Sequence, residues 1–186
     1  NDHFKQVLSI LELKKSEGKI SKELTWLNAR KAKISALIKN LAKYSVGSTL
    51  IRIHGNLHLA QILVSRSDAY FVNFEDGLSP ENKSHMSPLI DVADILCSFE
   101  DAGAITINAA QGVDAEAEII RLQQISVKYR RKTSEVFFKA YSLAAHALPH
   151  LWQSANAVDY CLRLARINNR LKEIIKASHR PEWIPV

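Results

Sequence analysis

Residues 51–76 read IRIHGNLHLAQILVSRSDAYFVNFED, and this stretch decides the fold expected for the chain. Its apolar residues are β-branched, aromatic or aliphatic and occur in runs of strand length: Leu50, Ile51, Ile53, Ile62, Leu63, Val64, Phe71 and Phe74. Gly55 and residues 65–68 interrupt these runs, as turns between strands do. The pattern predicts two short β-hairpins around a polar loop.

The polar loop collects side chains that bind metals or carry protons. These are His54, Asn56, His58 and Gln61 in the loop, with Asn73, Glu75 and Asp76 in the next turn. The predicted hairpins bring them together on short connections. The two histidines also have a structural interpretation, because the ring nitrogens of histidine often tie a loop together. Both interpretations stay open from the residues alone.

Four motifs follow one another along the chain: HGNLHLAQIL, VNFED, SPLIDVADILCSF and HRPEWIP. They resemble HGDLHLGQVL, IDFEG, SPLRDVAGMLRSF and the NRPDW tail of bacterial maltokinases, including those fused to trehalose synthase, which are aminoglycoside-phosphotransferase-like kinases. The resemblance runs from about residue 51 to the C-terminus. It implies a mainly α (α+β) fold, the C-terminal lobe of a protein-kinase-like protein, with helices around two hairpins that carry the catalytic loop. The N-terminal nucleotide-binding lobe would then be absent from this chain.

The same resemblance places the family's catalytic base on Asn56 and its magnesium-binding aspartate on Asn73. A carboxylate accepts a proton and offers anionic oxygens to Mg²⁺, whereas a carboxamide is a very poor base with a neutral oxygen. Loss of the base typically lowers a rate by ~10²–10⁴-fold, and phosphoryl transfer also needs metal-held charge. We therefore expect a maltokinase-like, ATP-dependent sugar phosphotransferase lobe of trehalose, maltose and glycogen metabolism that is impaired or inactive.

The resemblance also gives roles to the neighbours of these two amides. His54 and His58 are the candidate catalytic residues beside Asn56, and the metal positions, where binding is weak or lost, are Gln61, Asn73 and Glu75. Asp91 is the aspartate that accepts hydrogen bonds from the loop backbone, although the pattern alone also allows Asp91 or Asp94 to face solvent. Active relatives use Mg²⁺ and ATP, and the two amides leave open that this chain binds neither.

Helical periodicity covers most of the remaining chain. Residues 4–11 and 27–41 predict a helical hairpin, and Ser87-Pro88 predicts the start of an apolar helix. Two long helices follow, with core stripes at Val136, Ala140, Tyr141, Ala144 and Leu148, and at Tyr160, Leu164, Ile167, Leu171 and Ile174. Residues 108–112 are the expected linker. With 186 residues and 47% hydrophobic content, one domain spanning residues 1–186 is the simplest count.

A second hypothesis starts from the net charge of +6. Basic residues cluster at Lys128, Arg130, Arg131 and Lys132, and at Arg163, Arg166 and Arg170 on one helix face, as in modules that bind nucleic acid or protein. Charges of both signs and the lack of a nucleic-acid motif argue against nucleic acid. The favoured interpretation is a non-catalytic scaffold. Its expected partner is the missing kinase lobe or a fused or associated trehalose-metabolising domain. A maltose-like sugar is the ligand of active relatives.

No substrate-binding residue is identified. Asn168, Asn169, Arg170 and Trp183 are polar or aromatic enough for a saccharide, but structural roles explain them as well. Cys97 and Cys161 lack metal or disulfide spacing, which favours a reducing cytoplasm. No run approaches the ~18 apolar residues of a membrane span, so no membrane partner is expected.

Overall fold

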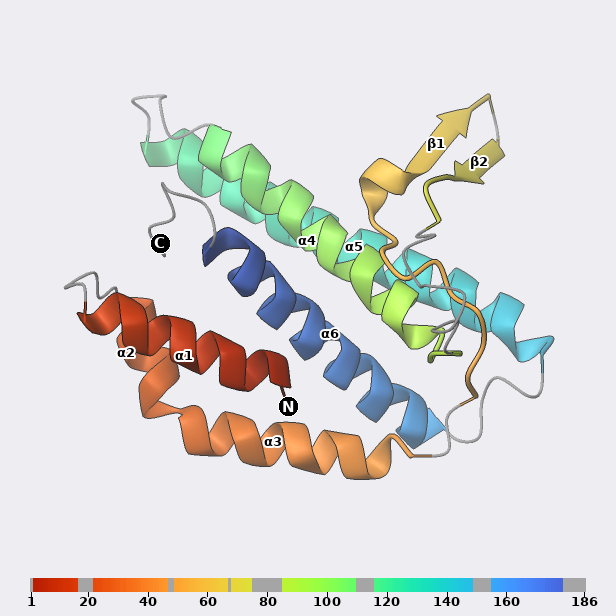
Figure 1. Cartoon of the computed structure of the whole chain (residues 1–186). Coiled ribbons are helices and arrows are strands. Elements are labelled where there is room, and N and C mark those ends of the chain that lie inside the picture. The colour runs from red at the N-terminus through yellow and green to blue at the C-terminus, as the bar shows by residue number, and fades with distance from the viewer. Residues whose placement is uncertain are drawn as a thin grey trace. The chain divides into compact units, whose positions relative to one another are not determined.

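Helices dominate this computed structural model, which describes residues 2–16, 22–46, 49–66, 68–74, 85–109, 116–148 and 155–178. The helices are α1 (Asp2–Ser16), α2 (Lys22–Ala29), α3 (Lys31–Tyr44), α4 (Leu89–Ala109), α5 (Glu116–His146) and α6 (Ala155–Ser178), with a short 3₁₀ helix η1 (Leu59–Gln61) (Figure 1). Strands β1 (Ile62–Ser65) and β2 (Asp68–Phe71) form one antiparallel sheet. The predicted fold class, mainly helical with a small antiparallel sheet, is confirmed.

The chain divides into two compact units. The helical unit is residues 1–47 and 156–186, and contains α1, α2, α3 and α6. The loop unit is residues 48–155, and contains the polar loop, β1, β2, α4 and α5. The single domain expected from length and composition stays a prediction.

The core of the helical unit forms where two predicted apolar stripes meet. On α1, Phe4, Val7, Leu8 and Leu11 are buried at helical spacing, as an amphipathic helix requires. Ile38 and Leu171 complete the cluster, and the other partly buried residues against it are Leu27, Ile34, Leu164, Ile167, Ile174 and Ile175. The core stripe predicted along α6 therefore faces this core, except that Tyr160 instead stacks on Tyr44 at 5.2 Å between ring centroids.

The helix predicted over residues 27–41 is broken in the structure. α2 ends at Ala29 and α3 begins at Lys31, with Arg30 between them at φ −107° and ψ 5°. The Arg30 guanidinium lies 4.2 Å from the centre of the Trp26 ring and donates to the Trp26 carbonyl oxygen. No glycine or proline marks this break, so the helical periodicity of the sequence predicted one continuous helix here.

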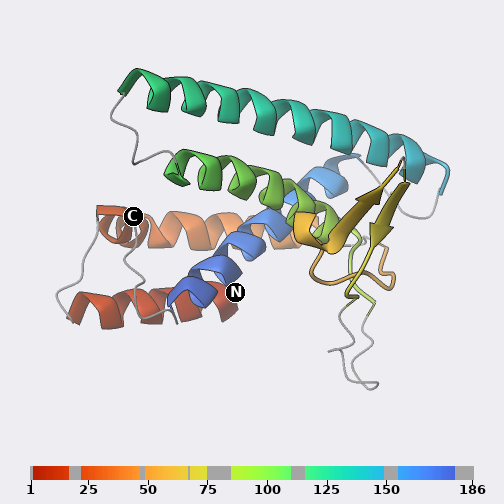
Figure 2. The same ribbon diagram turned by 90° about the horizontal axis from the view of Figure 1, so that it is seen from above.

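In the loop unit, α4 and α5 lie side by side and antiparallel (Figures 1 and 2). Ser87 and Pro88 precede α4 as predicted, and the Leu89 N–H donates to Ser87 Oγ. The buried residues of the helix include Leu89, Val92, Ala93, Ile95, Leu96 and Cys97. α4 continues to Ala109, so the linker predicted at residues 108–112 begins too early; residues 110–112 lie outside the described residues.

The stripe predicted along α5 is wrong at four of its five positions. Val136 and Leu148 are 53% and 56% exposed, and Ala140 and Ala144 are also exposed. The side that faces inward instead carries Phe137, Tyr141 and Ala145, of which Phe137 meets Phe99 of α4 edge-on at 5.9 Å. Apolar residues cover a broad arc of this helix, wider than the buried face, so spacing alone did not select that face.

Only one of the two predicted hairpins forms among the described residues. β1 and β2 pair with Ile62 opposite Phe71 and Ser65 opposite Asp68. Ile51, expected in the other hairpin, makes a single bridge with Met86, with two backbone hydrogen bonds of 2.9 Å. None of the described helices has the length and apolarity needed to cross a bilayer.

Candidate catalytic loop

Asp91 fastens the polar loop to the first turn of α4. Its Oδ2 accepts a hydrogen bond from the His54 backbone N–H at 2.7 Å, and its Oδ1 accepts one from the Gly55 N–H at 2.9 Å. Gly55 has φ 88°, a conformation that residues with a Cβ rarely adopt. A carboxylate is also favoured at this end of a helix, where free N–H groups carry partial positive charge. Asp91 thus makes the backbone contacts expected of a loop anchor.

His54 is 6% exposed and both of its ring nitrogens have partners. Nε2 lies 2.9 Å from the Val72 carbonyl oxygen, and Nδ1 lies 3.4 Å from the Asn56 N–H nitrogen. A carbonyl oxygen only accepts and an N–H only donates, so the neutral tautomer with hydrogen on Nε2 satisfies both contacts. The ring also faces Phe74, with centroids 4.7 Å apart. These contacts favour the structural interpretation of His54 over a proton-carrying one.

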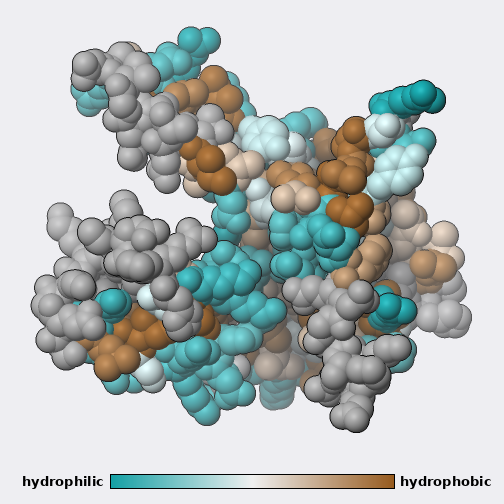
Figure 3. Space-filling view, turned by 45° about the horizontal axis from the view of Figure 1, so that its top comes forward, coloured by the Kyte–Doolittle hydropathy of each residue, from teal (hydrophilic) through white to brown (hydrophobic). Residues whose placement is uncertain are grey.

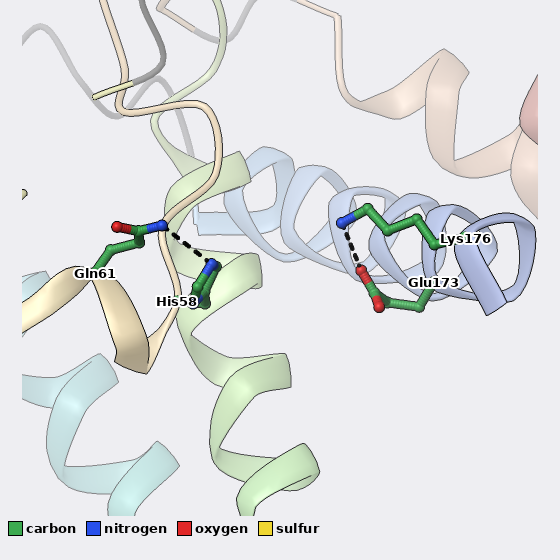
Figure 4. Close-up of polar contacts among 4 residues, drawn as sticks. All are labelled: His58, Gln61, Glu173 and Lys176. Atoms are coloured by element: carbon green, nitrogen blue, oxygen red, sulfur yellow. Dashed lines mark hydrogen bonds and ion pairs between the residues drawn. The ribbon is translucent and has the colours of Figure 1, made fainter. Parts of the chain in front are cut away.

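A second set of contacts joins three more of the predicted site residues. The Gln61 amide nitrogen lies 3.4 Å from His58 Nε2 (Figure 4), and Gln61 Oε1 accepts a hydrogen bond from Asn73 Nδ2 at 2.8 Å. Beside them, the Val72 N–H donates to the Gln61 carbonyl oxygen at 3.0 Å. The structure therefore brings His58, Gln61 and Asn73 together as expected from the sequence, with no carboxylate among them.

Asn56, at the position of the family's base, lies half-buried in the same loop. Its backbone N–H points to His54, and its side chain is a carboxamide that does not accept a proton at neutral pH. Glu75, the remaining predicted metal ligand, and Asp76 lie outside the described residues. The loop's described residues thus retain the anchor and the histidines but offer no carboxylate at the two decisive positions.

The described donors do not fit a magnesium site. Mg²⁺ prefers octahedral oxygen ligands that include one or two carboxylates. Within the described ranges, no three His, Cys, Asp or Glu side chains lie close enough together to hold a metal. The amide oxygen of Gln61 is already engaged by Asn73.

Behind the loop lies a cavity of about 940 Å³, bounded by the hairpin, α4 and α5. Its wall is mainly apolar and includes Ile53, Phe71 and Phe137, with Asp91 and Tyr141 among its few polar residues. Burial, and then the negative charge of Asp91, raise the pKa of Tyr141 above its ordinary value of 10.0. Tyr141, predicted in a core stripe, thus lies beside the loop, a position that its spacing did not indicate. The aromatic pair at 137 and 141, one helical turn apart, was the available signal.

The residues considered for sugar or nucleic acid lie on α5 and α6 or outside the described residues. In the helical unit, Asn168 Oδ1 accepts a hydrogen bond from His3 at 2.7 Å, and Arg163 pairs with Asp159 at 3.0 Å. Lys176 pairs with Glu173 on the same helix at 2.9 Å (Figure 4). In the loop unit, the basic residues 128 and 130–132 are exposed on α5. Trp183 lies outside the described residues.

The fold is similar to that of a known sugar kinase. No family model matches the sequence. A structure of glucosamine kinase, crystal form A, superposes with a TM-score of 0.69 over 97% of this chain and 42% of that chain, at 20% sequence identity. Glucosamine kinase in complex with glucosamine, ADP and inorganic phosphate gives a TM-score of 0.70 over 97% and 41%, at 19% identity.

Such identity supports a statement about fold alone, and the chain spans about two fifths of the length of these structures. The chain therefore has a kinase-like fold, of the kind seen in a sugar kinase.

Proposed function

We propose that this chain is the C-terminal lobe of a maltokinase-like protein in which phosphoryl transfer is impaired or lost. The observation that carries the proposal is a contrast within one loop. Asp91 still holds the backbone of His54 and Gly55, while the positions of the base and of the metal ligand are the amides Asn56 and Asn73. A loop that keeps its backbone anchor but lacks these two carboxylates can hold its conformation without catalysing phosphoryl transfer efficiently.

The partner proposed for this lobe is the kinase lobe absent from the chain, or a fused or associated trehalose-metabolising domain. The β1–β2 hairpin supports a partner because its apolar side chains lie in solvent. Leu63, Val64, Tyr70 and Phe71 are each more than half exposed, and hydrophobic groups gather beneath the hydrophilic tip of the hairpin (Figure 3). A two-stranded hairpin is marginally stable by itself, and exposed apolar patches usually mark interaction sites.

ATP, Mg²⁺ and a maltose-like sugar are the ligands of the active relatives that the motifs resemble. For this chain we propose weak or no binding of Mg²⁺, because the described donors near Asn73 are neutral. The proposed compartment is the cytoplasm, because Cys97 and Cys161 lack metal or disulfide spacing. A catalytically silent scaffold is the role that these features favour.

The test compares the full-length gene product with its Asn56→Asp/Asn73→Asp variant. Its intact mass, measured on material from the native source, first shows whether a nucleotide-binding lobe belongs to the same protein. ATP-dependent phosphorylation of maltose and of glucosamine is then measured for both proteins. We expect no turnover by the natural protein and measurable turnover by the variant, because both carboxylates are restored.

Asn28→Asp/Asn40→Asp, at exposed positions of α2 and α3, is the matched control, since it adds the same two negative charges outside the loop. Turnover by the natural protein within tenfold of the double variant would refute impairment. Silence of the double variant in a protein that possesses both lobes would refute a merely disabled kinase and favour long-standing non-catalytic use.

A further inference from the structure

We infer that the Asn73 amide takes the place of a divalent cation in this loop, so that a neutral hydrogen-bond chain keeps the loop closed without metal. The inference deepens the proposed function and rests on it only for identifying position 73 as the family's metal position. The contacts themselves belong to the described loop unit.

The chain of contacts joins the loop to the turn after β2. Asn73 Nδ2 donates to Gln61 Oε1 at 2.8 Å, and the Gln61 amide nitrogen reaches His58 Nε2 at 3.4 Å. The backbone bond from the Val72 N–H to the Gln61 carbonyl oxygen runs beside them at 3.0 Å. Residues 58, 61 and 73 are therefore connected in series without a carboxylate among them.

The reason for an amide at position 73 lies in what faces it. Gln61 directs its side-chain oxygen at residue 73, and two oxygens facing each other need a hydrogen or a cation between them. Asn73 supplies an N–H, whereas a carboxylate would require a metal or a reversal of the Gln61 amide. Asn73 has φ 56°, a left-handed conformation that Asn and Asp both tolerate. Exchanging the two thus changes charge and donor capacity but not backbone preference.

A cation would gain little from this arrangement. It would meet neutral oxygens only among the described members of the chain, and it would have to displace the Asn73 hydrogen from Gln61 Oε1. Hard cations such as Mg²⁺ lose their water reluctantly and need anionic ligands to compensate. Mg²⁺ should therefore not change the stability of the closed loop.

Four forms of the full-length gene product test this inference: the natural protein, Asn73→Asp, Gln61→Glu and the double variant. Thermal unfolding is followed in EDTA and in millimolar Mg²⁺ at matched ionic strength, without nucleotide. The natural protein should show the same Tm in both conditions. Gln61→Glu should behave likewise, because Asn73 still donates to either oxygen at position 61.

The double variant places two carboxylates against each other with no donor between them. In EDTA its Tm should fall below that of either single variant by roughly 2–5 °C, and Mg²⁺ should restore it saturably. Asn73→Asp alone should depend weakly on Mg²⁺, since the Gln61 amide is able to turn and donate. Hydrogen exchange of the Val72 amide gives a local readout that does not depend on global melting.

A saturable Mg²⁺ shift in the natural protein would overturn the inference, as would a double variant that ignores Mg²⁺. Gln61→Glu becoming as cation-dependent as the double variant would also overturn it, because Asn73 would then not be standing in for the metal. If the double variant does not fold, the natural protein and Gln61→Glu still decide. Failure of the proposed function would appear separately, as phosphotransfer by the natural protein, since no nucleotide enters these measurements.

Discussion

Replacing Asp91 by Asn tests how the loop is held. The Asp91 carboxylate accepts two backbone hydrogen bonds, from His54 at 2.7 Å and from Gly55 at 2.9 Å. Asn keeps one acceptor oxygen and turns an NH₂ group toward the other N–H, so one bond is lost and two donors face each other. The change is nearly isosteric, and the packing around α4 is retained.

The expected cost follows from the strength of these bonds. A hydrogen bond to a charged group contributes ~1.5–3 kcal/mol, and a donor left without a partner costs ~1–3 kcal/mol. Asp91 is only half-buried, so water relieves part of this cost. We expect Asp91→Asn to lower the free energy of unfolding by about 2 kcal/mol, and Asp91→Ala, which removes both acceptors, by about 3 kcal/mol.

Urea unfolding followed by far-UV circular dichroism measures the global effect, and hydrogen exchange of the His54 and Gly55 amides measures the local one. Asp159→Asn is the control, because the ion pair of Asp159 with Arg163 is exposed and such pairs contribute ~0–1 kcal/mol. A cost of Asp91→Asn no larger than that of this control, or unchanged exchange at His54 and Gly55, would show that Asp91 does not hold the loop.

Three further predictions follow from individual contacts. The raised pKa of Tyr141 means that its contribution to stability is complete below pH 10.0 and is lost as pH rises through the folded-state value; Tyr141→Phe, checked by thermal unfolding and tyrosinate absorbance, should remove that loss. A Cβ at Gly103 would overlap Ser126 Oγ, so Gly103→Ala should destabilise the natural protein by ~1 kcal/mol. In a Ser126→Ala background the overlap is gone and only the higher helix propensity of Ala remains, so the same change should stabilise by ~0.5–1 kcal/mol. Equal effects of Gly103→Ala on urea unfolding in both backgrounds would contradict the overlap. If the basic row binds nucleic acid, duplex affinity should fall steeply with rising salt and disappear in Arg163→Glu/Arg166→Glu; we expect no binding even at low salt, because charges of both signs are spread along the sequence and it carries no nucleic-acid motif.

The sequence alone was sufficient where local chemistry and position along the chain decide the outcome. Periodic apolar residues at 4, 7, 8 and 11 determined the buried face of α1, because helical geometry places them on one side. Ser87 and Pro88 determined where α4 begins. The hairpin expected between residues 61 and 73 is what allowed His58, Gln61 and Asn73 to be predicted together, since its antiparallel strands bring their outer ends side by side.

Tertiary structure decided the helix break, the buried faces and the hydrogen-bond partners that the local sequence patterns did not determine. The sequence did not show that α2 and α3 would be separated at Arg30. It also did not show which part of α5 would be buried, since the apolar residues cover a broader arc of that helix than the buried face. The tautomer and structural role of His54 depend on a carbonyl 18 residues away, and the loop is anchored by a carboxylate 36 or 37 residues away. Tyr141 lies near that carboxylate only because α4 and α5 are antiparallel. The physical reason is common to these cases: propensity and spacing fix the element, whereas burial and hydrogen-bond partners are fixed by whatever else occupies the space beside it.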